Sequence, residues 1–291
     1  MDTNLPQLLA CPAPAKLNLF LHITGRRADG YHLLQSVFQL IDRCDTLDFY
    51  VRADSQIRRL NQVANVAEQD DLVIRAANLL QQHCQISQGV DIRLHKHLPM
   101  GGGVGGGSSD AASTLMALNH LWQCHLSKED LMHLGLQLGA DVPFFIFGQN
   151  AFVEGIGEQM QAVDTPEQWF VVIEPGVHVP TPTIFSAKEL TRNTKPVRIT
   201  DFSNAAKIDW KNDLQAVACA LHPKIAEAIN WLAQFECNKG DAKMTGSGSC
   251  VFCAFPSEDD AKKIIEQVPA HWNSWHAKAI HQHPMNLVSK F

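Results

Sequence analysis

The sequence predicts an α+β fold organised in two domains. The chain has 291 residues, and because domains of roughly 100–200 residues are usual, two hydrophobic cores are expected. Segments with the period of a strand are mixed with segments of helical period, without the regular alternation of a doubly wound parallel sheet. We place the domain boundary near residue 155, which gives domains of residues 1–155 and 156–291. We also allow for the last residues packing back on the first domain.

The first half begins with strands and one helix. Residues 14–24 alternate aliphatic with other side chains, the pattern of a strand with one buried face. A polar loop over residues 25–30 separates it from a second strand-like segment, residues 36–49. Residues 70–84 predict an amphipathic helix behind an aspartate N-cap, and residues 90–95 predict a further strand.

Two more helices are expected before residue 140. The first begins at Ser108, after a glycine-rich segment, and carries its apolar side chains at helical spacing. The second opens at Ser127, because Ser127 and Asp130 have the spacing of a capping box, and ends near Gly139.

The second half predicts a small two-layer domain, because a strand is followed by a helix twice over. Residues 175–182, rich in proline, glycine and threonine, are expected to form an irregular loop between these elements. The expected strands cover residues 151–154, 169–174 and 250–255, and the expected helices cover residues 223–235 and 257–268.

Composition excludes several classes of protein. Hydrophobic residues make up 45% and charged residues 19% of the chain, an ordinary globular balance that excludes intrinsic disorder. The formal net charge is −6, so no general affinity for nucleic acid or anionic lipid is expected. No apolar run approaches the ~20 residues of a membrane-spanning helix, and the first residues lack the pattern of a signal peptide. We therefore expect a cytoplasmic protein. As a separate expectation, we take it to be a monomer or a weak homodimer.

The strongest local signal is a glycine-rich segment between a strand and a helix. Six of the seven residues from Gly101 to Gly107 are glycine. Each costs roughly 1 kcal/mol relative to alanine inside a helix or strand, so the run indicates unusual dihedral angles or close approach of a ligand. Free N–H groups at the start of the following helix would bind a diphosphate or triphosphate, although a flexible turn is the alternative. The candidate phosphate-binding residues are Pro99, Met100, Gly101, Gly102, Gly103, Val104, Gly105, Gly106, Gly107, Ser108 and Ser109.

Three well-known phosphate-binding motifs do not fit this segment. Gly101, Gly103 and Gly106 formally satisfy the dinucleotide fingerprint, but residues 123–138 predict loop and helix where that motif needs a second strand. A Walker A loop requires a lysine before its serine or threonine, and none is present. The catalytic-loop motifs of protein kinases do not follow either.

Three motifs of the chain resemble, in order and spacing, those of the GHMP small-molecule kinases. They are Pro14-Ala-Lys-Leu-Asn18, Pro99–Ala112 and Lys243-Met-Thr-Gly-Ser-Gly-Ser249. Further segments resemble the branch of this family that phosphorylates the 2-hydroxyl of 4-diphosphocytidyl-2-C-methyl-D-erythritol in the non-mevalonate route to isoprenoid precursors. These segments are Gly25–His32, Leu138–Pro143 and Pro180–Phe185.

The resemblance runs from about residue 12 to residue 255. It implies an N-terminal, ribosomal-protein-like domain that binds ATP and a C-terminal, ferredoxin-like domain that binds the substrate, with the site between them. It also implies ATP and Mg²⁺ as cofactors and a small molecule, a cytidine diphosphate derivative of methylerythritol, as the partner.

The resemblance implies catalytic roles for Asp141 and Lys16. In the family the aspartate accepts or orients the proton of the attacked hydroxyl, a role that contributes roughly 10²–10⁴-fold. The lysine lies beside it, where a cation favours the ionised carboxylate and stabilises the charge that develops during transfer. Without the resemblance, Asp141 is explained as the N-cap of a short helix beginning at Val142, and Lys16 as a solvated strand residue.

The resemblance also implies a pocket for the cytosine of the acceptor. Tyr31 and Phe185 would stack on the base and His32 would contact its edge, although core packing is the alternative for Phe185. A second glycine-containing loop, residues 246–248, would touch the diphosphate or shape the floor of the site, unless it is a plain hairpin turn. The candidate substrate-binding residues are Asn18, Tyr31, His32, Thr181, Phe185, Gly246, Ser247 and Gly248.

No metal-binding residues are assigned. The C-x-x-C pair of Cys250 and Cys253 lies in an expected buried strand without further ligands at zinc spacing, so free thiols are expected there. The histidines of residues 95–97 and 281–283 are expected at the surface. Asp110 is expected to complement the dipole of its helix and is not assigned to Mg²⁺.

Three alternatives stay open at this point. Another GHMP kinase would use mevalonate, homoserine or a sugar, which offer no base to stack. The formal dinucleotide fingerprint allows a nicotinamide-dependent enzyme. A non-catalytic nucleic-acid-binding module is the third, against which the net charge argues.

Overall fold

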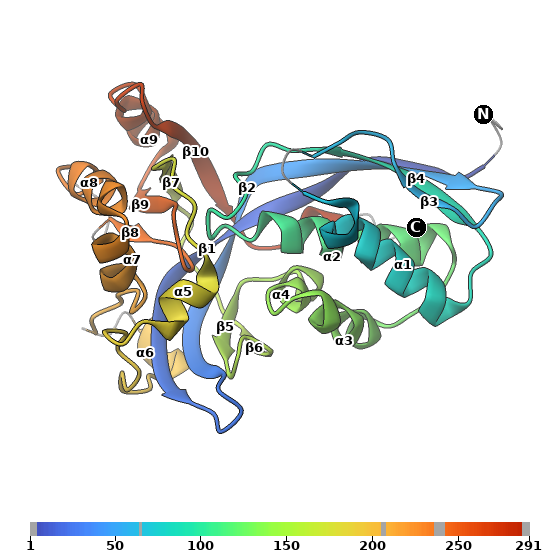
Figure 1. Ribbon diagram of the computed structural model, residues 1–291. Helices are drawn as coiled ribbons and strands as arrows, with labels where there is room; N and C mark the ends of the chain where they lie inside the picture. The colour runs from blue at the N-terminus through green and yellow to red at the C-terminus, as the bar shows by residue number, and fades with distance from the viewer. Residues whose placement is uncertain (1–4, 64–65, 205–207, 236–241, 287–291) are drawn as a thin grey trace.

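The computed structural model describes residues 5–63, 66–204, 208–235 and 242–286. Two long antiparallel strands, β1 (Gln7–Arg26) and β2 (His32–Arg52), run through both halves of the molecule (Figure 1). Their pairing shifts register at several points, among them between Pro14 and Ala15 and between Asn18 and Leu21. Both halves of the fold are built around this pair of strands.

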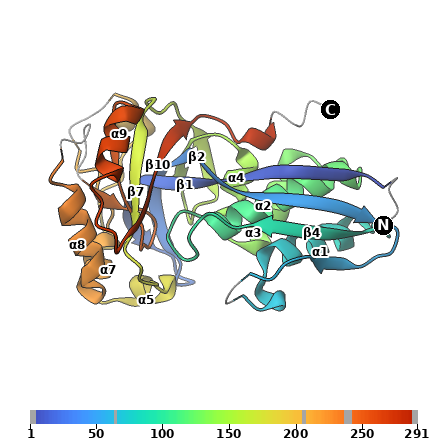
Figure 2. The ribbon, with the colours of Figure 1, turned by 90° about the horizontal axis from the view of Figure 1, so that it is seen from above.

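The first half consists of a sheet with helices on one face, as Figures 1 and 2 show. Strand β2 pairs with β4 and with β5, which extend the sheet to β3 and β6 respectively. The strands are β3 (Ile57–Arg59), β4 (Gly89–His95), β5 (Ala151–Glu154) and β6 (Gln159–Ala162). The helices are η1 (Glu68–Asp70), α1 (Leu72–Cys84), α2 (Gly106–Leu121), α3 (Lys128–Leu138) and α4 (Val142–Phe147).

The second half has the ferredoxin-like arrangement that the resemblance implies. Its strands are β7 (Trp169–Glu174), β8 (Lys243–Met244), β9 (Val251–Phe255) and β10 (Asn273–Ile280). Its helices are α5 (Thr181–Ser186), α6 (Ile199–Ser203), α7 (Gln215–Leu221), α8 (Pro223–Leu232) and α9 (Glu258–Ile265). The antiparallel order β10-β7-β9-β8, with helices between β7 and β8 and between β9 and β10, defines a β-α-β-β-α-β unit. The predicted α+β class is confirmed.

The two halves are joined by strand pairing and by side chains. Strand β10 pairs with β7 and also with β2, which makes the two sheets continuous. Ala15 and Leu17 of β1 pack with Phe170 of β7 and with Val104 of the glycine-rich loop. Near the end of the described chain, Met285 lies in the core of the first half. The glycine-rich loop is therefore held where the two halves meet.

The structure corrects the prediction that β1 has one buried face. Phe20 is buried in a cluster with Val37 and Phe152, while Leu21 and Ile23 belong to the core of the second half. Both faces are covered because the strand passes between the two halves. The alternation of aliphatic with other side chains therefore does not separate core from solvent. The two faces of the strand are buried in two different clusters.

Three further expectations are also corrected. Helix α2 begins at Gly106, two residues before Ser108, because Gly105 adopts the left-handed conformation at the N-cap. His283 is buried, not at the surface, and its ring accepts a hydrogen bond from the N–H of Met285. Cys250 is a free thiol as expected, whereas Cys253 is disulfide-bonded.

A membrane-spanning helix needs a long apolar stretch. Within the described ranges, no helix is long and apolar enough to cross a bilayer.

Candidate active site

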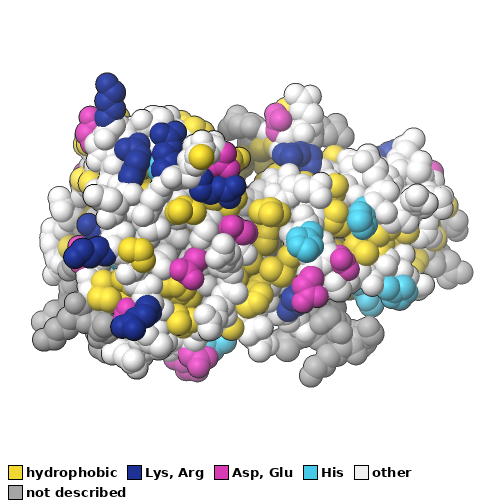
Figure 3. Space-filling model, turned by 90° about the horizontal axis from the view of Figure 1, so that it is seen from below, with side chains coloured by type: hydrophobic (Ala, Val, Ile, Leu, Met, Phe, Trp, Pro, Cys, Tyr) yellow, Lys and Arg dark blue, Asp and Glu magenta, His cyan; other side chains and the backbone are white. Residues whose placement is uncertain are grey.

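A cavity of about 1320 Å³ lies between the two halves. Small-molecule pockets are commonly ~300–1,000 Å³, so this cavity has room for two ligands side by side. On the face shown in Figure 3, hydrophobic side chains show between the two halves, and charged side chains of both signs are scattered around them. All the sequence-predicted site residues line the cavity except Val104 and Ser109, which are fully buried.

Lys16 and Asp141 lie side by side although 125 positions separate them in the chain. Lys16 Nζ is 3.4 Å from Asp141 Oδ2 and lies 4.6 Å from the centre of the Phe38 ring. The lysine side chain is 4% exposed, whereas the carboxylate is 33% exposed. A buried cation thus faces a carboxylate that solvent and ligands still reach.

Asn18 fixes the position of the Lys16 side chain. Its Oδ1 accepts a hydrogen bond of 2.6 Å from Lys16 Nζ, and its Nδ2 donates to Ser36 Oγ at 3.0 Å. Thr245 joins this network, because its hydroxyl accepts from the Asn18 N–H at 3.0 Å. A hydrogen bond between Asn18 and Thr245 therefore connects the first and third sequence motifs next to Lys16.

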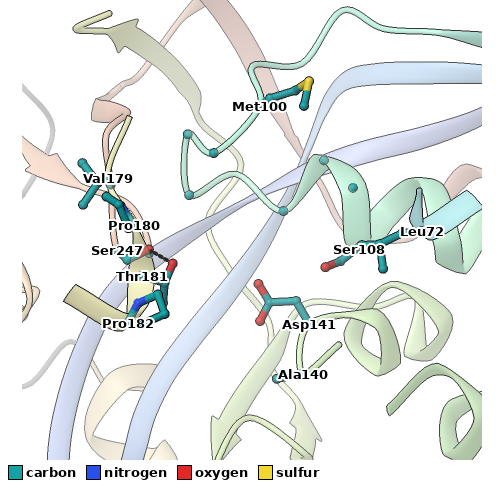
Figure 4. Close-up of a pocket in the computed structure, with 18 of the residues that line it drawn as sticks. Leu72, Met100, Ser108, Ala140, Asp141, Val179, Pro180, Thr181, Pro182 and Ser247 are labelled. Atoms are coloured by element: carbon teal, nitrogen blue, oxygen red, sulfur yellow. Dashed lines mark hydrogen bonds between the residues drawn. The ribbon is translucent and has the colours of Figure 1, made fainter. Parts of the chain in front are cut away.

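Asp141 occupies the N-cap position of α4 without capping it. The residue has φ −86° and ψ −14°, and its side chain makes no capping hydrogen bond. In Figure 4 the carboxylate faces the open space between the glycine-rich loop and Thr181. Capping alone therefore does not explain this aspartate, whose oxygens remain available to a ligand.

The glycine-rich loop owes its shape to close backbone approaches. Gly103 has φ +76°, and a Cβ there would lie 2.2 Å from the carbonyl oxygen of Thr245. Gly105 also has φ +76°, and a Cβ there would lie 2.8 Å from Phe145 Cζ. Backbone bonds from Lys16 N–H to Val104 O and from Cys250 N–H to Gly102 O tie the loop to both halves. These contacts indicate a fixed loop and not a flexible turn.

The N-terminus of α2 opens into the cavity. The helix has 16 residues and no side-chain hydrogen bond at its N-cap, so the N–H groups of its first turn have no helical partner and are available to an anion. Gly106, Gly107 and Ser108 line the cavity at this point. The arrangement suits a chain of phosphates that ends near Lys16 and Asp141.

A buried charge cluster beneath the loop was missed by the sequence reasoning. Lys96 Nζ contacts Asp45 Oδ2 at 2.5 Å and Asp110 Oδ2 at 2.9 Å. Asp45 also accepts the N–H groups of His97 and Leu98, where the chain enters the loop. Burial raises the pKa of Asp110 to about 7, with the neighbouring Asp45 adding to the effect and Lys96 opposing it. Asp110 is thus more than a partner of the helix dipole.

The other end of the cavity is built from side chains. Tyr31, in the β1–β2 turn, is 60% exposed, whereas Phe185 of α5 packs partly against the second core. The His32 ring lies 5.1 Å from the Phe185 ring, centre to centre. Core packing therefore accounts for part of the burial of the Phe185 side chain, whereas the exposed Tyr31 side chain has no role in the core.

The second glycine loop closes the floor of the site. Thr181 Oγ1 and Ser247 Oγ are 2.8 Å apart, a hydrogen bond drawn in Figure 4. Gly246 has φ +55°, and a Cβ there would lie 2.9 Å from the carbonyl oxygen of Gly103. Asn212, which the sequence reasoning did not single out, donates to the Gly246 carbonyl at 2.8 Å. The two glycine loops therefore pack directly on each other.

Comparisons with known proteins agree with this geometry. The family model described as the GHMP kinases N terminal domain matches residues 71–149, and the one described as GHMP kinases C terminal matches residues 193–274. A protein of Janthinobacterium sp. (strain Marseille) named 4-diphosphocytidyl-2-C-methyl-D-erythritol kinase is 64% identical over 96% of this chain and 97% of its own length. A Burkholderia pseudomallei (strain 668) protein of the same name is 53% identical over 98% of each chain.

Solved structures give the same result. The crystal structure of a 4-(cytidine 5'-diphospho)-2C-methyl-D-erythritol kinase superposes with a TM-score of 0.79 and 30% identity, over 94% of this chain and 99% of that one. The Methanococcus jannaschii mevalonate kinase superposes with a TM-score of 0.66 at 15% identity, over 97% of this chain and 100% of that one, and shows the shared fold.

Proposed function

Because this chain belongs to the 4-diphosphocytidyl-2-C-methyl-D-erythritol kinase family of the GHMP kinases, we propose that it transfers the γ-phosphoryl group of ATP to the 2-hydroxyl of 4-diphosphocytidyl-2-C-methyl-D-erythritol. ADP and the 2-phosphate are the products. The observation that carries the proposal is the contact between Lys16 and Asp141 in a cavity with room for both ligands.

The nucleotide occupies the side of the cavity formed by the glycine-rich loop. Its phosphates accept hydrogen bonds from the N–H groups at the start of α2 and from the hydroxyl of Ser108, which lines the cavity. Mg²⁺ prefers oxygen ligands and usually keeps several waters beside substrate phosphates, so the Ser108 hydroxyl fits as its protein ligand. The metal would neutralise charge on the phosphates.

Asp141 and Lys16 act on the acceptor hydroxyl. The carboxylate accepts a hydrogen bond from the 2-hydroxyl and takes its proton as the oxygen attacks the γ-phosphorus. Lys16, held by Asn18, lies beside the carboxylate and stabilises the charge on the transferring group. Transfer then depends mainly on positioning, because the nucleophile is a ready-made alcohol.

The acceptor occupies the other end of the cavity. Cytosine stacks between Tyr31 and Phe185, and His32 contacts its edge, as in the interpretation of the sequence motifs. Thr181, Ser247 and the backbone of Gly246 and Gly248 face the diphosphate. The requirement for a base distinguishes this acceptor from mevalonate and homoserine.

The same proposal covers the domain boundary, the localisation, the partners and the oligomeric state. The two family-model matches fall on either side of the boundary near residue 155, which supports domains of residues 1–155 and 156–291. We further propose that the protein is cytoplasmic, does not bind nucleic acid and is a monomer or weak homodimer.

An ADP-release assay tests the proposed function. The enzyme is supplied with ATP, Mg²⁺ and one acceptor at a time: the cytidylylated acceptor, free methylerythritol phosphate, mevalonate or homoserine. The proposal predicts ADP release with the cytidylylated acceptor far above the others, and loss of that release in Asp141→Asn. Preference for an acceptor without a base would contradict it.

A further inference from the structure

Arg192 links the wall of the acceptor pocket to the second half of the molecule. Its guanidinium makes four hydrogen bonds in a segment without regular secondary structure. Three go to carbonyl oxygens, those of Leu190 at 3.1 Å, Phe185 at 3.1 Å and Ala187 at 2.6 Å. The fourth is donated by Nε to His32 Nε2, at 3.1 Å.

The direction of that fourth bond determines where the proton of His32 lies. A guanidinium has donors only and keeps its charge in proteins, so Nε2 of His32 must accept with its lone pair. A neutral imidazole carries one proton, and with Nε2 as the acceptor this proton is on Nδ1. No hydrogen bond to Nδ1 is recorded among the described residues, and His32 lines the cavity.

The charges around His32 favour the neutral ring. Burial lowers the pKa of the His32 imidazole below its ordinary value, and the positive charges of Arg192 and Arg26 lower it further. Protonation of Nε2 would also break the bond with Arg192 and place two positive groups in contact. The ring therefore stays neutral near pH 7, with a single donor left for a ligand.

We propose that Arg192 holds His32 as its Nδ1–H tautomer and thereby selects cytosine over uracil in the acceptor. This inference rests on the proposed function, in which His32 contacts the base edge. Cytosine presents an acceptor at N3, which matches the Nδ1–H donor. Uracil presents N3–H, so two donors would face each other without a partner, which is costly in a desolvated site. Arg192 is a positioning residue, since it acts through His32.

The first test measures the tautomer in the free enzyme and needs no substrate. Long-range ¹H–¹⁵N correlation spectra of the histidine-labelled protein distinguish the two ring nitrogens, and the spectrum of His32→Asn identifies the His32 signals. The inference predicts a protonated Nδ1 and an unprotonated Nε2 in the wild type. In Arg192→Gln, the population shifts towards Nε2–H and the pKa of His32 rises. A wild-type ring protonated at Nε2 overturns the inference.

The second test measures selectivity. The ratio of kcat/KM for the cytidylylated acceptor to kcat/KM for its uridylylated analogue should fall about tenfold in Arg192→Gln, which corresponds to ~1.4 kcal/mol, while the KM for ATP stays the same. Arg198→Gln is the matched control, because Arg198 is 84% exposed and pairs only with Asp201 in α6 among the salt bridges of the described residues. An unchanged ratio in Arg192→Gln overturns the inference.

Two further results separate the possible failures. If Arg192→Gln does not fold, Arg192→Lys removes the directed Nε donor and keeps the charge, and the wild-type spectrum still decides the tautomer. If the wild type phosphorylates neither acceptor, the proposed function fails, and the tautomer together with its response to Arg192→Gln still decides the role of Arg192.

Discussion

The two ends of the cavity are built on opposite principles. The nucleotide end is bare backbone, held by close glycine contacts and by the buried cluster of Lys96, Asp45 and Asp110. The acceptor end is made of side chains, of which Tyr31 is largely exposed. A substitution at a glycine in close backbone contact, such as Gly103, therefore changes the fold before it changes binding, whereas a substitution of the exposed Tyr31 changes binding alone. The difference suggests that selectivity resides where side chains can vary without loss of stability.

The largest effect is expected where the two ends meet. Asp141→Asn keeps the shape of the side chain and removes its ability to take a proton, so kcat should fall by roughly 10²–10⁴-fold. The KM for ATP and the unfolding midpoint should stay near those of the wild type, because Asp141 makes no capping bond and the asparagine keeps an oxygen beside Lys16. Steady-state kinetics and thermal unfolding check this. Undiminished turnover would remove the assigned role.

The next largest effect is expected on stability, from substitutions in the glycine-rich loop at the nucleotide end of the cavity. Gly103→Ala places a Cβ against the Thr245 carbonyl at a positive φ, and we expect a loss of ~2–4 kcal/mol in the free energy of unfolding from strain and overpacking. Gly107→Ala is the matched control, since its Cβ would meet only Leu72 Cδ1 at 3.5 Å. In Gly107→Ala the higher helix propensity of alanine should raise the free energy of unfolding by ~1 kcal/mol. Urea denaturation measures both, and equal losses in the two variants would contradict the account.

A smaller effect is expected on the KM of the acceptor, from a substitution at the acceptor end of the cavity. Tyr31→Ala should raise the KM of the acceptor by ~5–150-fold, because stacking on a base contributes ~1–3 kcal/mol. The KM of ATP and the unfolding midpoint should not change. Met100→Ala, an exposed apolar residue at the other end of the cavity, should instead raise the KM of ATP. Identical kinetic changes in the two variants would mean that the ends are not separate sites.

The smallest effect concerns the buried cluster and depends on pH. Burial raises the pKa of Asp110 in the folded state to about 7 from its ordinary value of 3.8, so between these pH values the folded state holds a proton that the unfolded state has released. This contribution to stability is complete below pH 3.8 and is lost as the pH rises to about 7. Asp110→Asn stays neutral, so its unfolding midpoint relative to the wild type should be higher at pH 8 than at pH 5. A difference independent of pH would contradict the raised pKa.

Local patterns in the sequence predicted most elements of this fold, because period, capping residues and glycine content are properties of neighbouring residues. The capping box of Ser127 and Asp130 is confirmed in the structure, and the glycine-rich loop lies between strand and helix as predicted. The roles of Asp141 and Lys16 came from a family resemblance, and they stay predictions that the observed contact supports.

Contacts between distant segments could not be predicted. The face on which Lys16 lies depends on register shifts in β1, where one extra residue exchanges the two faces of the strand. Lys96 meets Asp45 across 51 positions, and no periodic pattern links them. Arg192 lies outside any helix or strand, so its bond to His32 leaves no signal in the sequence.

The central claim is that the glycine-rich loop and the N-terminus of α2 bind the phosphates of ATP so that the terminal phosphate lies beside Lys16 and Asp141. A crystal structure of the enzyme with a non-hydrolysable ATP analogue, Mg²⁺ and the cytidylylated acceptor tests this most directly. The account predicts the terminal phosphorus beside both side chains, with the acceptor hydroxyl against Asp141. A terminal phosphorus bound away from both residues would contradict it.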